Sequence, residues 1–173
     1  MRFNDDSTKR GIEGRYWTDD GVHCVYIQPT NHRWDWWTNF FGAWPRRHGY
    51  HRAWHDDACW LLTWLAQNTD GGDYRLYGHS RGGAVAMIVA DYLARASNGT
   101  QHHKVECVTF GAPKPGRLHG GFTLKEYRHR GDLVPFLPLM YRKHSKRVAF
   151  GDWEPFWKAH MSYNEMMRLE GAR

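Results

Sequence analysis

The stretch RLYGHSRGGAVAM, residues 75–87, joins two structural patterns through a single serine. Residues 74–77, YRLY, are typical of a short β-strand, and the alanine-rich residues 81–96 predict a helix. Between them, residues 78–82, GHSRG, have the spacing G-x-S-x-G, in which a sharp turn lifts the Ser80 hydroxyl above the edge of a sheet. Glycines are needed there because larger side chains would meet the neighbouring strand and helix. The alternative is a glycine-rich turn that binds a phosphate or nothing.

The flanking sequence extends the same alternation. Further strands are expected at residues 22–28, 104–110 and 123–129, and further helices at residues 52–67 and 158–169. Residues 1–10 are expected to be loose, and residues 139–157 to be irregular or a hairpin. Strands that alternate with helices predict an α/β fold with a mainly parallel sheet covered on both faces. We expect one domain over residues 1–173.

Composition limits the class of protein. The formal net charge of +6 fits attraction to phosphates or anionic lipid, but the basic residues are scattered, which is typical of a solvated face. Ten tryptophans indicate large rigid contact surfaces in the core or at an apolar ligand. Cys24, Cys59 and Cys107 are widely spaced in apolar contexts, which predicts buried free thiols. No apolar stretch resembles a secretory signal or a membrane span, so we expect a cytoplasmic protein.

A nucleophilic serine needs a base, and the base needs a carboxylate to orient it. Asp132 directly follows a predicted strand, at the end of the sheet where open α/β sheets place their chemistry. Its alternative role is a local turn bond within RGDLV, residues 130–134. The histidines after Asp132 are His144, in a basic stretch typical of a surface turn, and His160, at the start of the last predicted helix. Position favours His160 as the base, while spacing alone leaves both open.

Four segments resemble, in chain order, motifs of the class 3 lipase family, the fungal-lipase-like α/β-hydrolases. YGHSRGGAVA (77–86) resembles the nucleophile segment, VTFGAPKPG (108–116) the next strand, YRHRGDLVPFLP (127–138) the acid segment, and AHMSYNEM (159–166) the terminal histidine segment. HGYHRAW (48–54) resembles the approach to the helix before the serine. The resemblance implies an α/β-hydrolase fold with a minimal lid and a carboxylic ester hydrolase without cofactor. It implies the catalytic set Ser80, Asp132 and His160.

The resemblance also implies an oxyanion hole. The family's first donor lies in an F-R-G-[ST] segment, to which IQPT (27–30) corresponds, so this role falls to the N–H of Thr30. The second donor is the N–H of Arg81. Gln28 and Pro29 depart from the family pattern, as does Arg81, which replaces the usual leucine and adds a cation beside the site.

Residues 33–47, RWDWWTNFFGAWPRR, are the candidate cover of the site. Trp36, Trp37, Phe40 and Phe41 have mixed helical spacing, which fits either a helix packed on the sheet or an acyl-binding wall that touches an anionic lipid surface. His79, beside the serine, is a further candidate substrate contact.

The expected partner is an ester or lipid substrate, with contact to an anionic lipid surface and no nucleic acid. Two alternatives stay open: a catalytically weak module that binds an anionic surface, membrane or nucleic acid, and a phospholipase that cleaves acyl esters. His51 and His55 share a helix face with Asp56 and Asp57 nearby, but no third metal ligand is evident, so we expect no metal.

Overall fold

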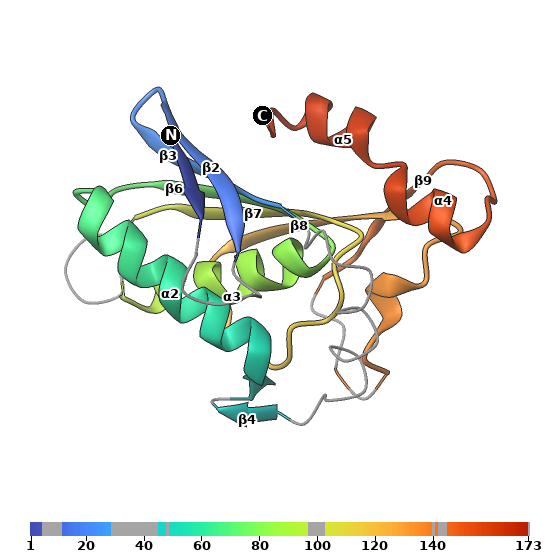
Figure 1. The fold of residues 1–173 in the computed structure, drawn as a ribbon, viewed down its shortest axis with the longest axis horizontal. Helices are drawn as coiled ribbons and strands as arrows, with labels where there is room; N and C mark the ends of the chain where they lie inside the picture. Colours follow the sequence, from blue (N-terminus) through green and yellow to red (C-terminus); the bar gives the residue numbers. More distant parts are fainter. Residues whose placement is uncertain are drawn as a thin grey trace.

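A seven-stranded sheet crosses the molecule in the order β1-β2-β3-β6-β7-β8-β9 (Figure 1). The computed structural model describes residues 1–4, 12–28, 45–47, 49–96, 103–139, 141 and 145–172. The strands are β1 (Arg2–Asn4), β2 (Glu13–Asp19), β3 (Val22–Ile27), β4 (Pro45–Arg47), β5 (Tyr50–His51), β6 (Tyr74–His79), β7 (Val105–Phe110), β8 (Thr123–His129) and β9 (Val148–Phe150). The helices are α2 (Arg52–Asn68), α3 (Arg81–Ala96), the short 3-10 helix η2 (Val134–Phe136), α4 (Phe156–Met161) and α5 (Asn164–Leu169).

Most of the sheet is parallel, as the sequence predicts. β3, β6, β7, β8 and β9 pair in parallel, while β1, β2 and β3 form an antiparallel edge. β4 and β5 pair separately from this sheet. Because parallel strands end at the same edge, the segments that follow β6 and β8 come together there.

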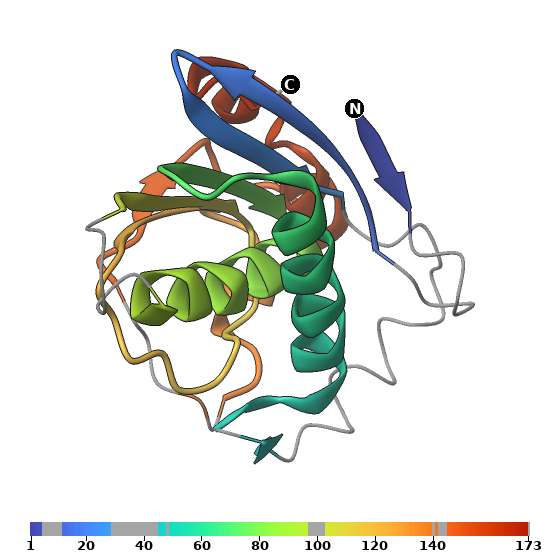
Figure 2. The same cartoon turned by 90° about the vertical axis from the view of Figure 1, so that its left-hand side faces the viewer.

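Helices cover both faces of the sheet. α2 and α3 lie on one face and α5 lies on the other (Figure 2). The first face holds a large buried cluster that includes Trp54, Leu61, Leu76 and Ile88. On the second face, Tyr77, Phe110 and Tyr127 pack with Tyr163, and Met166 and Met167 of α5 lie against them.

The alanine-rich composition of α3 follows from its place against the sheet. Every residue from Arg81 to Asp91 is buried. A Cβ atom on Gly83 would lie 2.6 Å from the Cβ of Ala112, in the loop after β7. The helix therefore approaches the loop after β7 so closely that glycine is required at position 83.

The expectation of a loose N-terminus is wrong for residues 2–4, which form β1. This short edge strand pairs with residues 13–15 of β2, and the Phe3 ring packs 5.2 Å from the Trp64 ring of α2. β1 is stabilised by its pairing with β2 and by the burial of Phe3, and a sequence of three residues predicts neither.

Three further expectations are corrected. Within residues 139–157, which were expected to be irregular or a hairpin, residues 148–150 form β9 parallel to β8. The predicted last helix is two helices, α4 and α5, separated at Ser162, whose hydroxyl donates to the Lys158 carbonyl at 2.7 Å and so bends the chain. Cys59 is exposed because it lies off the buried stripe of α2, whereas Cys24 and Cys107 are buried as expected.

Candidate functional site

Ser80 occupies the turn between β6 and α3. Its backbone φ is +53°, in the left-handed region that residues other than glycine rarely adopt. The turn is held by hydrogen bonds from the Ser80 N–H to the Phe110 carbonyl at 2.9 Å and from the Gly83 N–H to the Ser80 carbonyl at 3.0 Å. Strained backbone of this kind persists only where its surroundings impose it, and it is typical of functional sites.

The two glycines of the motif are required by close backbone packing. A Cβ atom on Gly78 would lie 2.4 Å from the Gly82 carbonyl oxygen, and one on Gly82 would lie 2.4 Å from the Ile27 carbonyl oxygen. Real Cβ atoms do not approach oxygen so closely. The turn therefore has the tight strand-to-helix geometry that the sequence predicts for residues 78–82.

Asp132 and His160 meet at the carboxyl edge of the sheet. Asp132 lies in the loop after β8 and His160 lies in α4, and the distance from His160 Nδ1 to Asp132 Oδ2 is 2.9 Å. Both side chains are buried, with exposed fractions of 1% for His160 and 0% for Asp132. The Val134 N–H donates to the other carboxylate oxygen at 2.9 Å. Asp132 thus makes a local turn bond and also holds the imidazole, so its two sequence interpretations are compatible.

Tyr163 is a partner of Asp132 that the sequence reasoning missed. Its hydroxyl donates to Asp132 Oδ2 at 2.6 Å and accepts the His129 N–H at 2.8 Å. Burial and the neighbouring Asp132 charge raise the pKa of this phenol, so it stays a neutral donor. A Cβ atom on Gly111, which has a positive φ, would lie 2.7 Å from Asp132 Oδ2. The signal that could have found Tyr163 is its position three residues after His160.

His79 connects the serine turn to α4. Its Nε2 lies 3.0 Å from the His160 carbonyl oxygen, and the two imidazole rings stack with centroids 5.1 Å apart. Burial and the nearby His160 lower the pKa of His79 to about 4, so the ring is neutral near pH 7 and its Nε2–H can donate. His79 is buried rather than open to solvent, and the substrate contact predicted for it stays a prediction.

The Arg81 side chain is neutralised by a residue that the sequence reasoning did not pair with it. One guanidinium nitrogen of Arg81 lies 2.5 Å from Asp57 Oδ2 of α2. The two side chains are only 9% and 12% exposed. The cation expected beside the site is therefore directed to α2 and compensated there.

His51, the last residue of β5, and His55 of α2 have structural roles. His51 stacks on Trp54 with ring centroids 4.0 Å apart, and His55 Nε2 lies 2.9 Å from the Tyr92 hydroxyl. Among the described residues, no group of three His, Cys, Asp or Glu side chains could hold a metal ion. Within the same ranges, no helix is both long enough and apolar enough to cross a membrane.

Several predicted site residues lie outside the described residues. They are Thr30, the first candidate oxyanion donor, His144, the alternative base, and the aromatic side chains Trp36, Trp37, Phe40 and Phe41. Their roles stay predictions, as do the catalytic roles of Ser80, Asp132 and His160.

Comparison with known proteins finds one matching family model and several solved structures of similar fold. The family model Lipase (class 3) matches residues 25–142, and no curated protein matches the chain. The lipase of Rhizopus microsporus var. chinensis is 17% identical, with 89% of this chain and 61% of that chain covered and a TM-score of 0.68. The native propeptide complex of Rhizomucor miehei lipase is 16% identical, with 86% and 56% covered and a TM-score of 0.67.

A third solved structure is a triacylglycerol lipase whose catalytic centre is described as a serine protease triad. It is 17% identical, with 82% of this chain and 62% of that chain covered and a TM-score of 0.61. The chain thus spans between 56% and 62% of the length of these three lipases. At such identities the likeness shows the fold, which is the α/β-hydrolase fold predicted from the sequence.

Proposed function

This chain belongs to the class 3 lipase family, and from that membership we propose that it is a serine hydrolase that cleaves carboxylic esters of lipids. The observation that carries the proposal is the 2.9 Å contact between His160 Nδ1 and Asp132 Oδ2 at the edge of the sheet where Ser80 lies. The serine protease triad described for a triacylglycerol lipase of the same fold supports assigning Ser80, His160 and Asp132 to the same roles.

In the proposed reaction, the Ser80 hydroxyl oxygen attacks the ester carbonyl carbon while His160 Nε2 takes its proton. The imidazolium then gives this proton to the leaving alkoxide, and the alcohol departs from the acyl-enzyme. Water next attacks the acyl carbonyl, again with His160 as the base, and the carboxylic acid leaves as Ser80 regains its proton. Asp132 accepts the Nδ1–H throughout and stabilises the cation that forms on His160.

The proposed oxyanion hole combines the backbone N–H groups of Arg81 and Thr30. Arg81 is the first residue of α3, a helix of sixteen residues, where free N–H groups and the helix dipole favour negative charge. Pro29 has no N–H, but the donor belongs to Thr30, so the departure from the family motif leaves this role possible.

A water-insoluble ester is supported by the surface around His160. Trp153, Trp157 and Met161 follow one another at intervals of four residues, and they are 80%, 59% and 65% exposed. Leu133, next to Asp132, is 54% exposed. Large apolar side chains gathered beside catalytic candidates suit a lipid surface better than water. Tryptophan in particular is favoured where an apolar phase meets water.

The rival function, a weakly active module that binds an anionic surface, was motivated by net charge and by Arg81. The ion pair between Arg81 and Asp57 accounts for that cation within the fold. A module that only binds would also have no need of the contact between His160 and Asp132.

The test is hydrolysis of p-nitrophenyl esters from acetate to palmitate by the wild type, Ser80→Ala and Ser145→Ala. We expect Ser80→Ala to lose about 10⁴-fold or more in kcat. Ser145→Ala removes a different hydroxyl, which is bonded to Glu126, and should keep its activity. A fluorophosphonate probe should label the wild type and not Ser80→Ala. Equal rates for the wild type and Ser80→Ala at every chain length would refute the proposal.

A further inference from the structure

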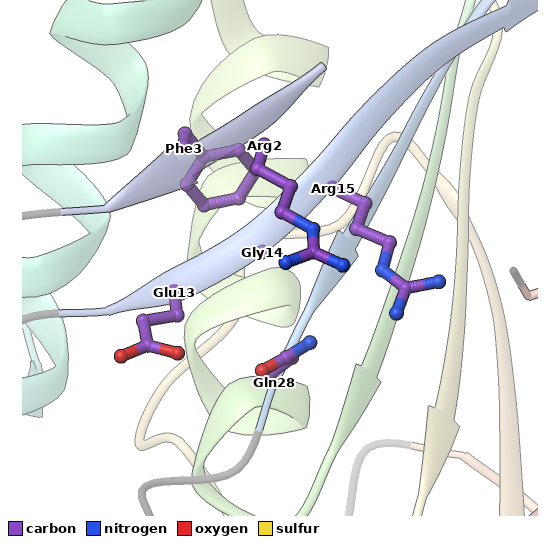
Figure 3. A pocket seen from close by; sticks show the side chains of 6 residues that line it. All are labelled: Arg2, Phe3, Glu13, Gly14, Arg15 and Gln28. Carbon is purple, nitrogen blue, oxygen red and sulfur yellow. The ribbon is translucent and has the colours of Figure 1, made fainter.

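A hollow of about 430 Å³ opens at the β1–β2 edge of the sheet (Figure 3). Its lining residues are Arg2, Phe3, Glu13, Gly14, Arg15 and Gln28. The volume lies within the range of small-molecule sites, about 300–1,000 Å³. The hollow is therefore large enough for a phosphate group together with the group that it esterifies.

Two arginines face each other across this edge. Arg2 of β1 and Arg15 of β2 are directly paired in the antiparallel register, and both are exposed. Like charges directly opposite across strands are destabilising. Over the described ranges, neither guanidinium forms an ion pair with a carboxylate. Among the described side chains, the pair is thus a concentration of positive charge without a carboxylate partner.

The remaining polar groups of the hollow favour an anion. In Figure 3 the side chains of Arg2 and Arg15 extend to the same side, and Glu13, the one acidic residue of the lining, extends away from them. Gln28 adds an amide, and its backbone is fixed by an N–H bond to the Glu13 carbonyl at 2.9 Å. The two guanidinium groups and the NH2 group of Gln28 are hydrogen-bond donors, and guanidinium matches phosphate oxygens in bidentate geometry.

We propose that this hollow binds a phosphate group, carried either by a lipid headgroup or by a free phosphate compound, through Arg2, Arg15 and Gln28. No covalent step is involved, and binding does not require Ser80.

The position of the hollow relates phosphate binding to the proposed reaction at Ser80. Ile27 pairs in parallel with Gly78, so Gln28 follows at the edge where the Ser80 turn begins. Arg15 lies two strands from β6, about 10 Å at the usual strand spacing. Arg15 is level with Tyr77, three residues before Ser80, so a phosphate group bound there would lie on the β1–β2 side of the serine turn, and a phospholipid acyl ester would be the favoured substrate. This last step rests on the proposed function.

The test uses Ser80→Ala protein, so that no ester is cleaved during binding. Three double variants are compared in it: Arg2→Gln with Arg15→Gln, Arg2→Lys with Arg15→Lys, and the control Arg52→Gln with Arg168→Gln. Arg52 and Arg168 are exposed and lie outside the hollow, so the control removes the same charge elsewhere. The glutamine pair should fold normally because it removes a repulsion, which urea unfolding checks. The lysine pair keeps the charge and loses only the bidentate geometry.

One arm titrates inorganic phosphate and glycerol 3-phosphate by calorimetry. The other sediments the protein with phosphatidylcholine vesicles with and without phosphatidic acid. We expect the glutamine pair to weaken binding about tenfold or more, the lysine pair to fall between it and the parent, and the control pair to change little. If the glutamine pair loses binding only to the vesicles, the ligand is a lipid headgroup. If it loses binding in the calorimetric titration, the ligand is a free phosphate compound.

The proposal is overturned if the parent binds neither probe, or if the control pair loses as much affinity as the glutamine pair. Because the readout is binding by a protein without the serine hydroxyl, failure of the proposed hydrolase leaves this result unaffected. Equally, a negative result in the phosphate-binding test leaves the ester assays unaffected.

Discussion

Replacing Tyr163 with phenylalanine removes one hydroxyl and tests how Asp132 is held in place. The hydroxyl donates to Asp132 Oδ2 at 2.6 Å and accepts the His129 N–H at 2.8 Å, and both residues bonded to it are buried. A hydrogen bond to a charged group contributes about 1.5–3 kcal/mol, and a buried N–H left without a partner costs about 1–3 kcal/mol. The two effects share one atom, so we expect the free energy of unfolding to fall by about 3 kcal/mol.

The same change should lower activity by less than loss of Asp132 itself would. Asp132 keeps its bonds from His160 and Val134, so the imidazole stays oriented but its carboxylate is less firmly fixed. We expect kcat on p-nitrophenyl butyrate to fall about tenfold with KM nearly unchanged, since the substrate does not touch Tyr163 in the proposed reaction.

Tyr77→Phe is the matched control. Tyr77 is buried in the same cluster, and its hydroxyl donates to the Glu170 carbonyl at 2.8 Å rather than to Asp132. A neutral hydrogen bond of this kind contributes about 1 kcal/mol, and its loss should leave kcat unchanged. Urea unfolding gives the free energy of unfolding of both variants, and steady-state kinetics gives their kcat. If Tyr163→Phe is no less stable than Tyr77→Phe and keeps full kcat, Asp132 does not depend on the phenol and the reasoning fails.

The pKa of His79 lies near 4 in the folded protein and about 6.5 in the unfolded chain, so the unfolded chain binds more protons between these values. Stability should therefore decrease as the pH falls below about 6.5, by about 2 kcal/mol at pH 5, and His79→Gln should flatten this slope in urea titrations; an unchanged slope would refute the assignment. Trp157→Glu places a charge on the exposed apolar face of α4, so hydrolysis of a dispersed triacylglycerol should fall about tenfold while hydrolysis of soluble p-nitrophenyl acetate stays within about twofold. An equal loss on both substrates would mean that this face acts on the site and not on the lipid surface.

The sequence predicted the central elements closely because their signals are local. The strand over 123–129 and the helix over 81–96 have the predicted bounds, and the strand predicted at 22–28 ends one residue earlier. The helix over 81–96 and the strand over 22–27 contain runs of apolar residues, and the strand over 123–129 ends at the turn that begins with Arg130 and Gly131. The contact between Asp132 and His160, at 2.9 Å, lies where chain order and the end of a strand led us to expect an acid and a base.

The missed features depend on contacts between distant segments. β1 and β9 have three residues each and are ordered by pairing with β2 and β8. Tyr163 looks from its sequence like an ordinary helical residue, and only the approach of α4 to the loop after β8 brings its hydroxyl to Asp132. The spacing of three residues from His160 is a local hint, but the contact with Asp132 depends on the packing of segments 31 residues apart.

Arg81 shows how one departure from a family motif can require a second. A cation in the first turn of α3 is unfavourable, because the helix dipole is positive there and the proposed oxyanion needs that potential. The Arg81 side chain is also only 9% exposed, which makes an uncompensated charge costly. Asp57 removes both costs by placing a carboxylate 2.5 Å away. A leucine at position 81 would need no such partner, so Asp57 and Arg81 are best understood as one unit that keeps the backbone N–H of residue 81 available.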